Sequence, residues 1–290
     1  MGGVDVNVGA STGEQTAHRH FLATVATDVP TESSFRAWWR QSRPLAVRQI
    51  VVFVRDVPTL IQALLFPALS MLMFKVVLGD AIGSATGQNS AYGTVPLVIL
   101  VGAMFGSIAS ATRLNRERAT GLLARLYVLP IHRAADLTSR VMSEVARILV
   151  TTLILLSAGH LIGFRFTQGL ASAIGLVLVA LAYGVAFATL TLALAVSARP
   201  GAPIVPYLGL ASSLLMFFNS GFSPISAYPS WLQPIVANQP MTPAIETMRA
   251  LAAGGPLAEN LTKVIVWTVV ILVISIYPAL RGYQKAARDR

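Results

Sequence analysis

Six long stretches that are rich in Leu, Val, Ile, Ala and Phe constrain this chain more than any other feature. No water is available in the hydrocarbon core of a bilayer to satisfy backbone amides, so an apolar run of about 20 residues has to form a helix there. The runs cover residues 58–78, 95–112, 148–164, 170–196, 204–222 and 264–280. Because Pro and Gly separate the third, fourth and fifth runs, the sequence predicts an all-α integral membrane protein with six transmembrane helices.

The basic residues indicate which ends of these helices face the cytoplasm. Of the 22 Lys and Arg, 18 fall on one side: six in residues 1–57, seven in 113–147, Arg199, and four in 281–290. The other four are Lys75, Arg165, Arg249 and Lys263. Lys and Arg accumulate in cytoplasmic loops, so both termini are expected in the cytoplasm. Charge scattered in this way is unlike the single basic patch of a nucleic-acid-binding protein, although the net charge is +10.

The segments outside the apolar runs predict tails and an interfacial helix. Residues 1–34 are polar and predict a flexible cytoplasmic tail, and residues 281–290 predict a short basic one. Two Trp and three Arg side chains occur within residues 36–43, with the Arg residues on one helical stripe. Trp and Arg favour the head-group zone, so residues 35–57 are expected to hold an amphipathic helix that lies along the inner leaflet before Pro44. A solvated basic linker is the alternative.

The longest segment on the predicted cytoplasmic side, residues 113–140, has a helical pattern of its own. Four Leu residues recur at helical spacing, and Pro130 marks the end of the pattern. They are Leu122, Leu123, Leu126 and Leu129. Such an apolar stripe is able to dock against a partner. Charged residues three or four apart follow it, which predicts a helix that begins in water. The expected pairs are Asp136–Arg140, Arg140–Glu144 and Glu144–Arg147.

The segment between the last two apolar runs, residues 223–256, is dense in proline. Thr242 as N-cap, Pro243 as the first helical residue and Gly254 as a stop predict a helix of about 11 residues, or about 16 Å. This length is half of a membrane. We therefore expect short re-entrant helices that dip into the outer leaflet.

Several chemistries find no support in the sequence. There is no Cys, the four His do not come at metal-ligand spacing, and the apolar runs lack Asp and Glu. No catalytic residue and no metal site is therefore predicted, and an ion-coupled transporter is disfavoured. No Gly-Lys pair occurs, so the chain cannot form the phosphate-binding loop Gly-x4-Gly-Lys-Ser/Thr. A membrane-embedded lipid-modifying enzyme is the alternative from another functional class, and composition does not exclude a channel or scaffold.

Two segments resemble the permeases of type-2 ABC exporters. The inner loop of that family typically runs Glu-Arg-Glu-x-Gly-Thr-Leu-Glu, then Leu, then Pro. The matching residues here are Glu117, Arg118, Gly121, Leu123, Leu126 and Pro130, whereas Ala119 and Ala124 each replace an acid. The outer signature is matched by Pro224, Pro229, Trp231, Leu232, Asn238, Pro240 and Arg249. The resemblance covers roughly residues 45–285, and within the family the chain looks like the DrrC-type permeases of daunorubicin-resistance and mycobacterial lipid-export systems.

The resemblance implies a heterotetrameric exporter in the bacterial inner membrane. Its other chains would be a second, DrrB-like permease and two copies of a DrrA-like ATPase that bind ATP and Mg²⁺. The segment that receives the motion of the ATPase would contain Glu117, Arg118, Gly121, Leu122, Leu123, Leu126 and Pro130. An adaptable apolar translocation path would contain Phe66, Met71, Met73, Met104, Phe105, Met216, Phe217 and Phe218, for each of which helix packing or lipid contact is the alternative. The substrate would be a lipophilic drug or a complex lipid such as phthiocerol dimycocerosate.

Overall fold

Helices make up nearly all of the chain that the computed structural model describes, namely residues 35–55, 57–121, 135–198 and 204–288. The long helices are α2 (Phe35–Arg55), α3 (Val57–Thr86), α4 (Ala91–Ala119), α6 (Ala135–Leu161), α7 (Gly169–Ser197) and α11 (Ala258–Arg288). The short ones are α8 (Ile204–Phe217), the 3₁₀ turn η1 (Ile225–Ala227), α9 (Gln233–Asn238) and α10 (Met241–Ala253). No strand occurs within these ranges, which confirms the all-α expectation for the described part of the chain.

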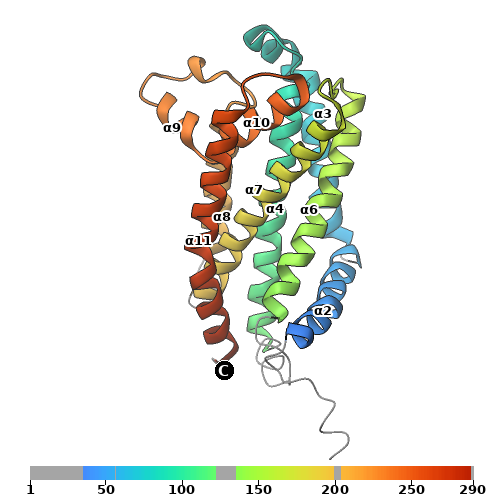
Figure 1. Cartoon of the computed structure of the whole chain (residues 1–290), viewed down its shortest axis with the longest axis vertical. Helices are drawn as coiled ribbons and strands as arrows, with labels where there is room; N and C mark the ends of the chain where they lie inside the picture. Colours follow the sequence, from blue (N-terminus) through green and yellow to red (C-terminus); the bar gives the residue numbers. More distant parts are fainter. Residues whose placement is uncertain (1–34, 56, 122–134, 199–203, 289–290) are drawn as a thin grey trace, which may run out of the picture.

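Helix α4 forms the centre of an elongated bundle (Figure 1). Helices α3, α6, α7, α8 and α10 pack against it, and side chains on every side of it, such as Leu97, Leu100 and Met104, are buried. A helix that is apolar all round has to be enclosed by other helices. Small residues allow the neighbours to approach closely: a side chain at Gly184 of α7 would collide with Ile148.

Four helices in the described residues are long and apolar enough to cross a bilayer. These are Ala91–Ala119, Thr138–Leu161, Gly169–Ser197 and Ala258–Ala279. The first and fifth predicted spans contain shorter apolar stretches, Pro67–Val77 in α3 and Pro206–Phe217 in α8. Helix α8, at 14 residues, is only about 21 Å long, against about 30 Å of hydrocarbon. The structure supports a multi-pass membrane protein, and the count of six spans stays a prediction.

The two ends of the bundle are distinguished by the helices that they carry. We call the end that carries the last turns of α4 and α11 the base, and the end that carries α9 and α10 the top (Figure 1). Helix α2 packs on α6 beside the base and runs as one helix through Pro44, where an earlier end was expected. The predicted tail, residues 1–34, and residues 289–290 lie outside the described residues.

Helix α10 lies close to where the sequence places it. It begins at Met241 with Pro240 as N-cap, so Thr242 is inside the first turn and is not the cap as expected. Gly254 ends the helix, as predicted, with a φ of 88° that favours glycine. Helix α9 is tied to α11 by a hydrogen bond of 2.8 Å from the Trp267 indole to the Asn238 carbonyl. The described helices establish where these elements lie in the bundle, and their re-entrant character stays a prediction.

Candidate functional site

Four charged side chains form a cluster between α4 and α6 near the base. We call Glu117, Arg140, Glu144 and Arg147 the α4–α6 ion cluster. Arg140 reaches across to α4, where its Nη2 lies 2.5 Å from Oε2 of Glu117. Arg147 pairs along its own helix, with Nη2 at 2.6 Å from Oε2 of Glu144. All four side chains are at most 12% exposed, so these are interior ion pairs whose loss would leave an uncompensated charge.

The Glu144–Arg147 pair is held by α4 as well as by α6. Ser110 of α4 donates to Oε1 of Glu144, while Arg147 donates to the Ala103 carbonyl at 3.2 Å. Gly106 makes room for the guanidinium, because a Cβ there would lie 1.9 Å from Arg147 Nη1. Polar and ionic bonds thus join α4 to α6.

The predicted pairs are therefore confirmed in part. Glu144–Arg147 forms as expected. Arg140 pairs with Glu117 on α4, a partner that spacing along α6 could not indicate. Glu117 also lies 3.9 Å from Arg48 of α2. Its carboxylate points into the protein, which favours a role in fixing α4 against α2 and α6 over direct contact with a partner chain.

The end of α4 is fixed at two further positions of the inner motif. Arg118 donates to the Ala198 carbonyl at 2.8 Å, which ties α4 to the end of α7. Gly121 follows the helix with a φ of 72°, and its N–H donates to the Arg118 carbonyl at 3.1 Å. This left-handed conformation is one that glycine adopts at little cost. The remaining inner-motif residues, Leu122, Leu123, Leu126 and Pro130, lie outside the described residues.

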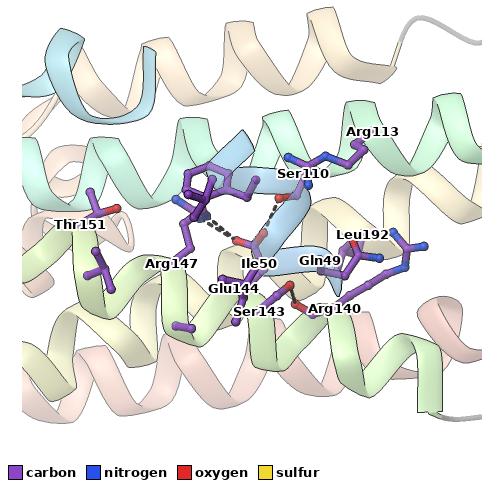
Figure 2. A pocket seen from close by; sticks show the side chains of 14 residues that line it. Gln49, Ile50, Ser110, Arg113, Arg140, Ser143, Glu144, Arg147, Thr151 and Leu192 are labelled. Atoms are coloured by element: carbon purple, nitrogen blue, oxygen red, sulfur yellow. Dashed lines mark hydrogen bonds and ion pairs between the residues drawn. The ribbon is translucent and has the colours of Figure 1, made fainter. Parts of the chain in front are cut away.

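A cavity of about 140 Å³ opens between α2, α4 and α6 beside the ion cluster (Figure 2). Its polar lining comprises Gln49, Ser110, Arg113, Arg140, Ser143, Glu144, Arg147 and Thr151. Its apolar lining includes Ile50, Phe53, Val54, Val150 and Leu192. The sequence did not indicate this cavity, because its walls come from segments that are distant in the chain, on α2, α4 and α6 with Leu192 of α7. The only local signal was the i,i+3 spacing of Glu144 and Arg147.

The residues expected to form a translocation path do not share one surface of the chain. Met71 and Met104 are in the core, where the Tyr183 hydroxyl donates to the Met104 sulfur at 3.0 Å. Met216 is partly buried against the same core. The exposed members are Met73, Phe105, Phe217 and Phe218. Phe66 belongs to α3, and its side chain is outside the described set.

The residues of the outer signature lie together at the top of the bundle. Pro224 precedes η1, Pro240 is the N-cap of α10, and Trp231 is 70% exposed. Pro229 is exposed, and its carbonyl accepts from Leu232 N at 2.8 Å. Arg249 lies further inside. It pairs with Glu246 at 2.7 Å and donates to the Ser220 carbonyl at 2.9 Å.

The contact between α4 and this outer segment is close. A Cβ on Gly93 of α4 would lie 2.4 Å from the Gly221 carbonyl and 2.9 Å from Arg249. Tyr228 donates to the Asn219 carbonyl at 2.9 Å, and burial raises the pKa of its phenol, so the donor stays protonated near neutral pH. The outer segment is thus packed closely against α4 at the top of the bundle.

Lys75 illustrates how a charge is accommodated near the top. Its ammonium donates to Oδ1 of Asn89 at 3.0 Å, just before α4 begins. The structure therefore gives it a polar partner at the end of the bundle, in keeping with the expected anchoring role. Among the residues that the structure describes, no group of three His, Asp or Glu is placed to hold a metal ion.

Similarity to known proteins identifies the family. Residues 40–252 match the family model described as ABC-2 type transporter, which is well over half of the chain. The chain belongs to the ABC-2 type transporter family. Membership fits the apolar helices and the inner and outer motifs placed above. It makes the chain a transport subunit and not a catalytic enzyme.

Three curated relatives narrow the position within the family. The chain is 39% identical over 240 residues to "Probable doxorubicin resistance ABC transporter permease protein DrrC" of Mycobacterium tuberculosis, which covers 83% of this chain and 87% of the relative. It is 26% identical over 243 residues to the daunorubicin resistance permease DrrB1 of Streptomyces coeruleorubidus, covering 80% and 86%. It is 29% identical over 172 residues to the doxorubicin resistance permease DrrB of M. tuberculosis, covering 59% and 60%. This protein is a DrrC-like type-2 ABC permease.

Proposed function

We propose that this ABC-2 permease moves a lipid or a lipophilic drug from the cytoplasm or inner leaflet outward, driven by ATP that a separate chain hydrolyses. The observation that carries the proposal is the course of α4. This enclosed helix runs from the inner motif at the base to the outer segment at the top. A helix that is packed over most of its surface moves together with its neighbours, because tightly packed interfaces do not deform continuously.

The proposed arrangement in the membrane has six spans, with α3 and α8 as the first and fifth. Both termini would be cytoplasmic, and the base would face the cytoplasm. The concentration of Arg residues near the base, including Arg113, Arg116 and Arg118 at the end of α4, supports this orientation. Residues 35–57 would be the interfacial helix and residues 223–256 the outer re-entrant segment.

Coupling would act through residues 113–140. The described flanks of this segment, the end of α4 and the start of α6, are joined by the Glu117–Arg140 pair. A force applied between them by an ATPase would therefore displace both helices together. The Leu stripe would dock on the ATPase, while Glu117 and Arg118 would hold the end of α4 in place.

The proposed partners follow from the relatives. Permeases named DrrB and DrrC are separate chains, and this chain, which lacks a phosphate-binding loop, would pair with a DrrB-like permease and two DrrA-like ATPase subunits that bind ATP and Mg²⁺. The exposed side chains of Met73, Phe105, Phe217 and Phe218 are the remaining candidates for an apolar path. The relatives' names support a lipophilic drug, and the apolar surface suits a lipid equally.

The test is reconstitution of this chain with its ATPase and second permease, followed by measurement of ATP hydrolysis and export. Gly121→Pro is expected to abolish stimulation of the ATPase by substrate, because proline cannot adopt a φ of 72°. Gly169→Pro is the matched control: its φ is 83°, and a Cβ there also meets open space, but it lies at the top. Equal coupling loss in both variants would refute the coupling role. A chain that alters a lipid chemically when alone would refute the transport function.

A further inference from the structure

Two buried polar side chains that line the cavity in Figure 2 each have an atom without a hydrogen-bond partner among the described residues. Gln49 is 5% exposed, and its Nε2 is one of these atoms. Arg147 is 7% exposed, and its Nη1 is the other. Such groups are costly in an interior, which predicts that something polar satisfies them in the membrane. Both side chains line the same cavity.

The charge of the cavity favours an anion. Among the described residues, the lining holds three Arg side chains, Arg113, Arg140 and Arg147, and one carboxylate, Glu144. Even when Glu117 is counted as the partner of Arg140, one positive charge remains. Arg113 carries that charge, since no described residue bonds to its guanidinium. An Arg fork beside a cavity suits the oxygens of a phosphate or a carboxylate.

The other walls of the cavity favour an alkyl chain. Ile50 and Val54 of α2 and Val150 of α6 line it and are 36%, 55% and 54% exposed. The polar interior therefore opens sideways onto apolar side chains. A cavity of about 150 Å³ has room for a group the size of benzene, so a head group fits inside about 140 Å³ while a chain does not.

We propose that the cavity between α2, α4 and α6 binds the phosphate or carboxylate head group of an anionic membrane lipid, whose alkyl chain lies between α2 and α6 along Ile50, Val54 and Val150. Arg113 and the Gln49 amide bind the head group, and the ion cluster supports them. The bound lipid joins α2 to α4 and α6, beside the segment proposed to receive ATPase motion. The proposed binding of the lipid does not depend on the proposed transport function.

The experiment measures binding of phosphatidylglycerol, phosphatidylcholine and inorganic phosphate to the purified full chain in neutral detergent, with no ATPase present. Phosphatidylglycerol is expected to bind at least about tenfold more tightly than either of the others. Arg113→Gln is expected to weaken its binding about tenfold, as for the loss of a hydrogen bond to a charged group. Arg116→Gln removes the same charge from the exposed side of the same helix and is expected to change the affinity less than about twofold.

A second variant keeps the test decisive if Arg113→Gln folds poorly. Gln49→Leu removes an unpartnered buried amide, so it is expected to raise the unfolding temperature of the lipid-free chain while it weakens binding of phosphatidylglycerol. Equal affinity for the two lipids would overturn the proposal, and so would an equal effect of Arg113→Gln and Arg116→Gln. Inorganic phosphate that binds as tightly as phosphatidylglycerol would show a free-anion site and overturn the lipid assignment.

Discussion

Gly106→Ala tests the structure of the ion cluster with a single methyl group. The added Cβ would lie 1.9 Å from Nη1 and 2.4 Å from Cζ of Arg147, far inside van der Waals contact. The guanidinium is the end of a flexible side chain, but it is enclosed between α4 and α6. Moving it breaks its bonds to Glu144 at 2.6 Å and 3.1 Å and to the Ala103 carbonyl at 3.2 Å.

The expected loss of stability is the difference between two terms. Removing one partner from a buried ion pair costs about 3–5 kcal/mol, because the other charge stays buried. Replacing Gly by Ala within a helix gains about 1 kcal/mol. We therefore expect Gly106→Ala to lower the free energy of unfolding by about 2–4 kcal/mol.

Denaturant titration of the purified chain in detergent measures this difference. Gly102→Ala is the control, because Gly102 lies one turn earlier on α4 and a Cβ there meets Leu155, Pro67 and Thr151 at ordinary contact distances of 3.7–3.8 Å. It is expected to be neutral or to stabilise the chain by up to about 1 kcal/mol.

A rescue experiment identifies the cause. In the background Glu144→Gln with Arg147→Met, which removes both charges and shortens the side chain that faces Gly106, Gly106→Ala is expected to cost less than about 1 kcal/mol. If Gly106→Ala does not destabilise the natural chain, or if it lowers the free energy of unfolding by the same amount in the uncharged background, the Arg147 guanidinium does not occupy the space beside Gly106 and the reasoning is wrong.

Three further predictions concern the ends of the bundle. A cysteine at the exposed Ser230 is expected to react with an impermeant maleimide from outside, and one at the exposed Ala119 only from inside. A cysteine at the buried Ser90 is expected to stay unreactive. The opposite sidedness would reverse the proposed orientation. Arg249→Lys is expected to destabilise the chain by about 1–2 kcal/mol, because an ammonium cannot bridge Glu246 and Ser220 as the guanidinium does. Lys263→Gln, in a more exposed ion pair, is expected to destabilise it less; equal costs would contradict this. Tyr228→Phe is expected to cost about 1 kcal/mol through the lost bond to Asn219. A tyrosine phenol in an unfolded chain has a pKa of about 10, and burial raises the pKa of Tyr228 in the folded chain. The phenol is therefore protonated in both states below pH about 9, and the cost of Tyr228→Phe is expected to be constant between pH 5 and 9. A cost that varies in this range would refute the assignment.

The sequence by itself determined the local features of this protein. Apolar runs free of acids predicted helices, and helices α3, α4, α6, α7, α8 and α11 overlap the predicted runs. Gly254 predicted the end of α10, because a left-handed conformation at a helix end favours glycine whatever surrounds it. The motifs of the inner and outer segments indicated the family, since they depend on residue order and not on packing.

Contacts between helices were decided only by the tertiary structure. Spacing along α6 could not reveal that Arg140 pairs with Glu117, because the partner depends on how α4 and α6 are rotated against each other. The orientation of the other helices in the bundle matters in the same way: Met71 of α3 and Met104 of α4, which sequence reasoning placed on a translocation path, are buried, whereas Phe217 of α8 is exposed. Helical periodicity gives the faces of one helix, whereas a cavity or a buried ion pair requires faces of several helices to meet, and that meeting follows from the packing of the whole bundle.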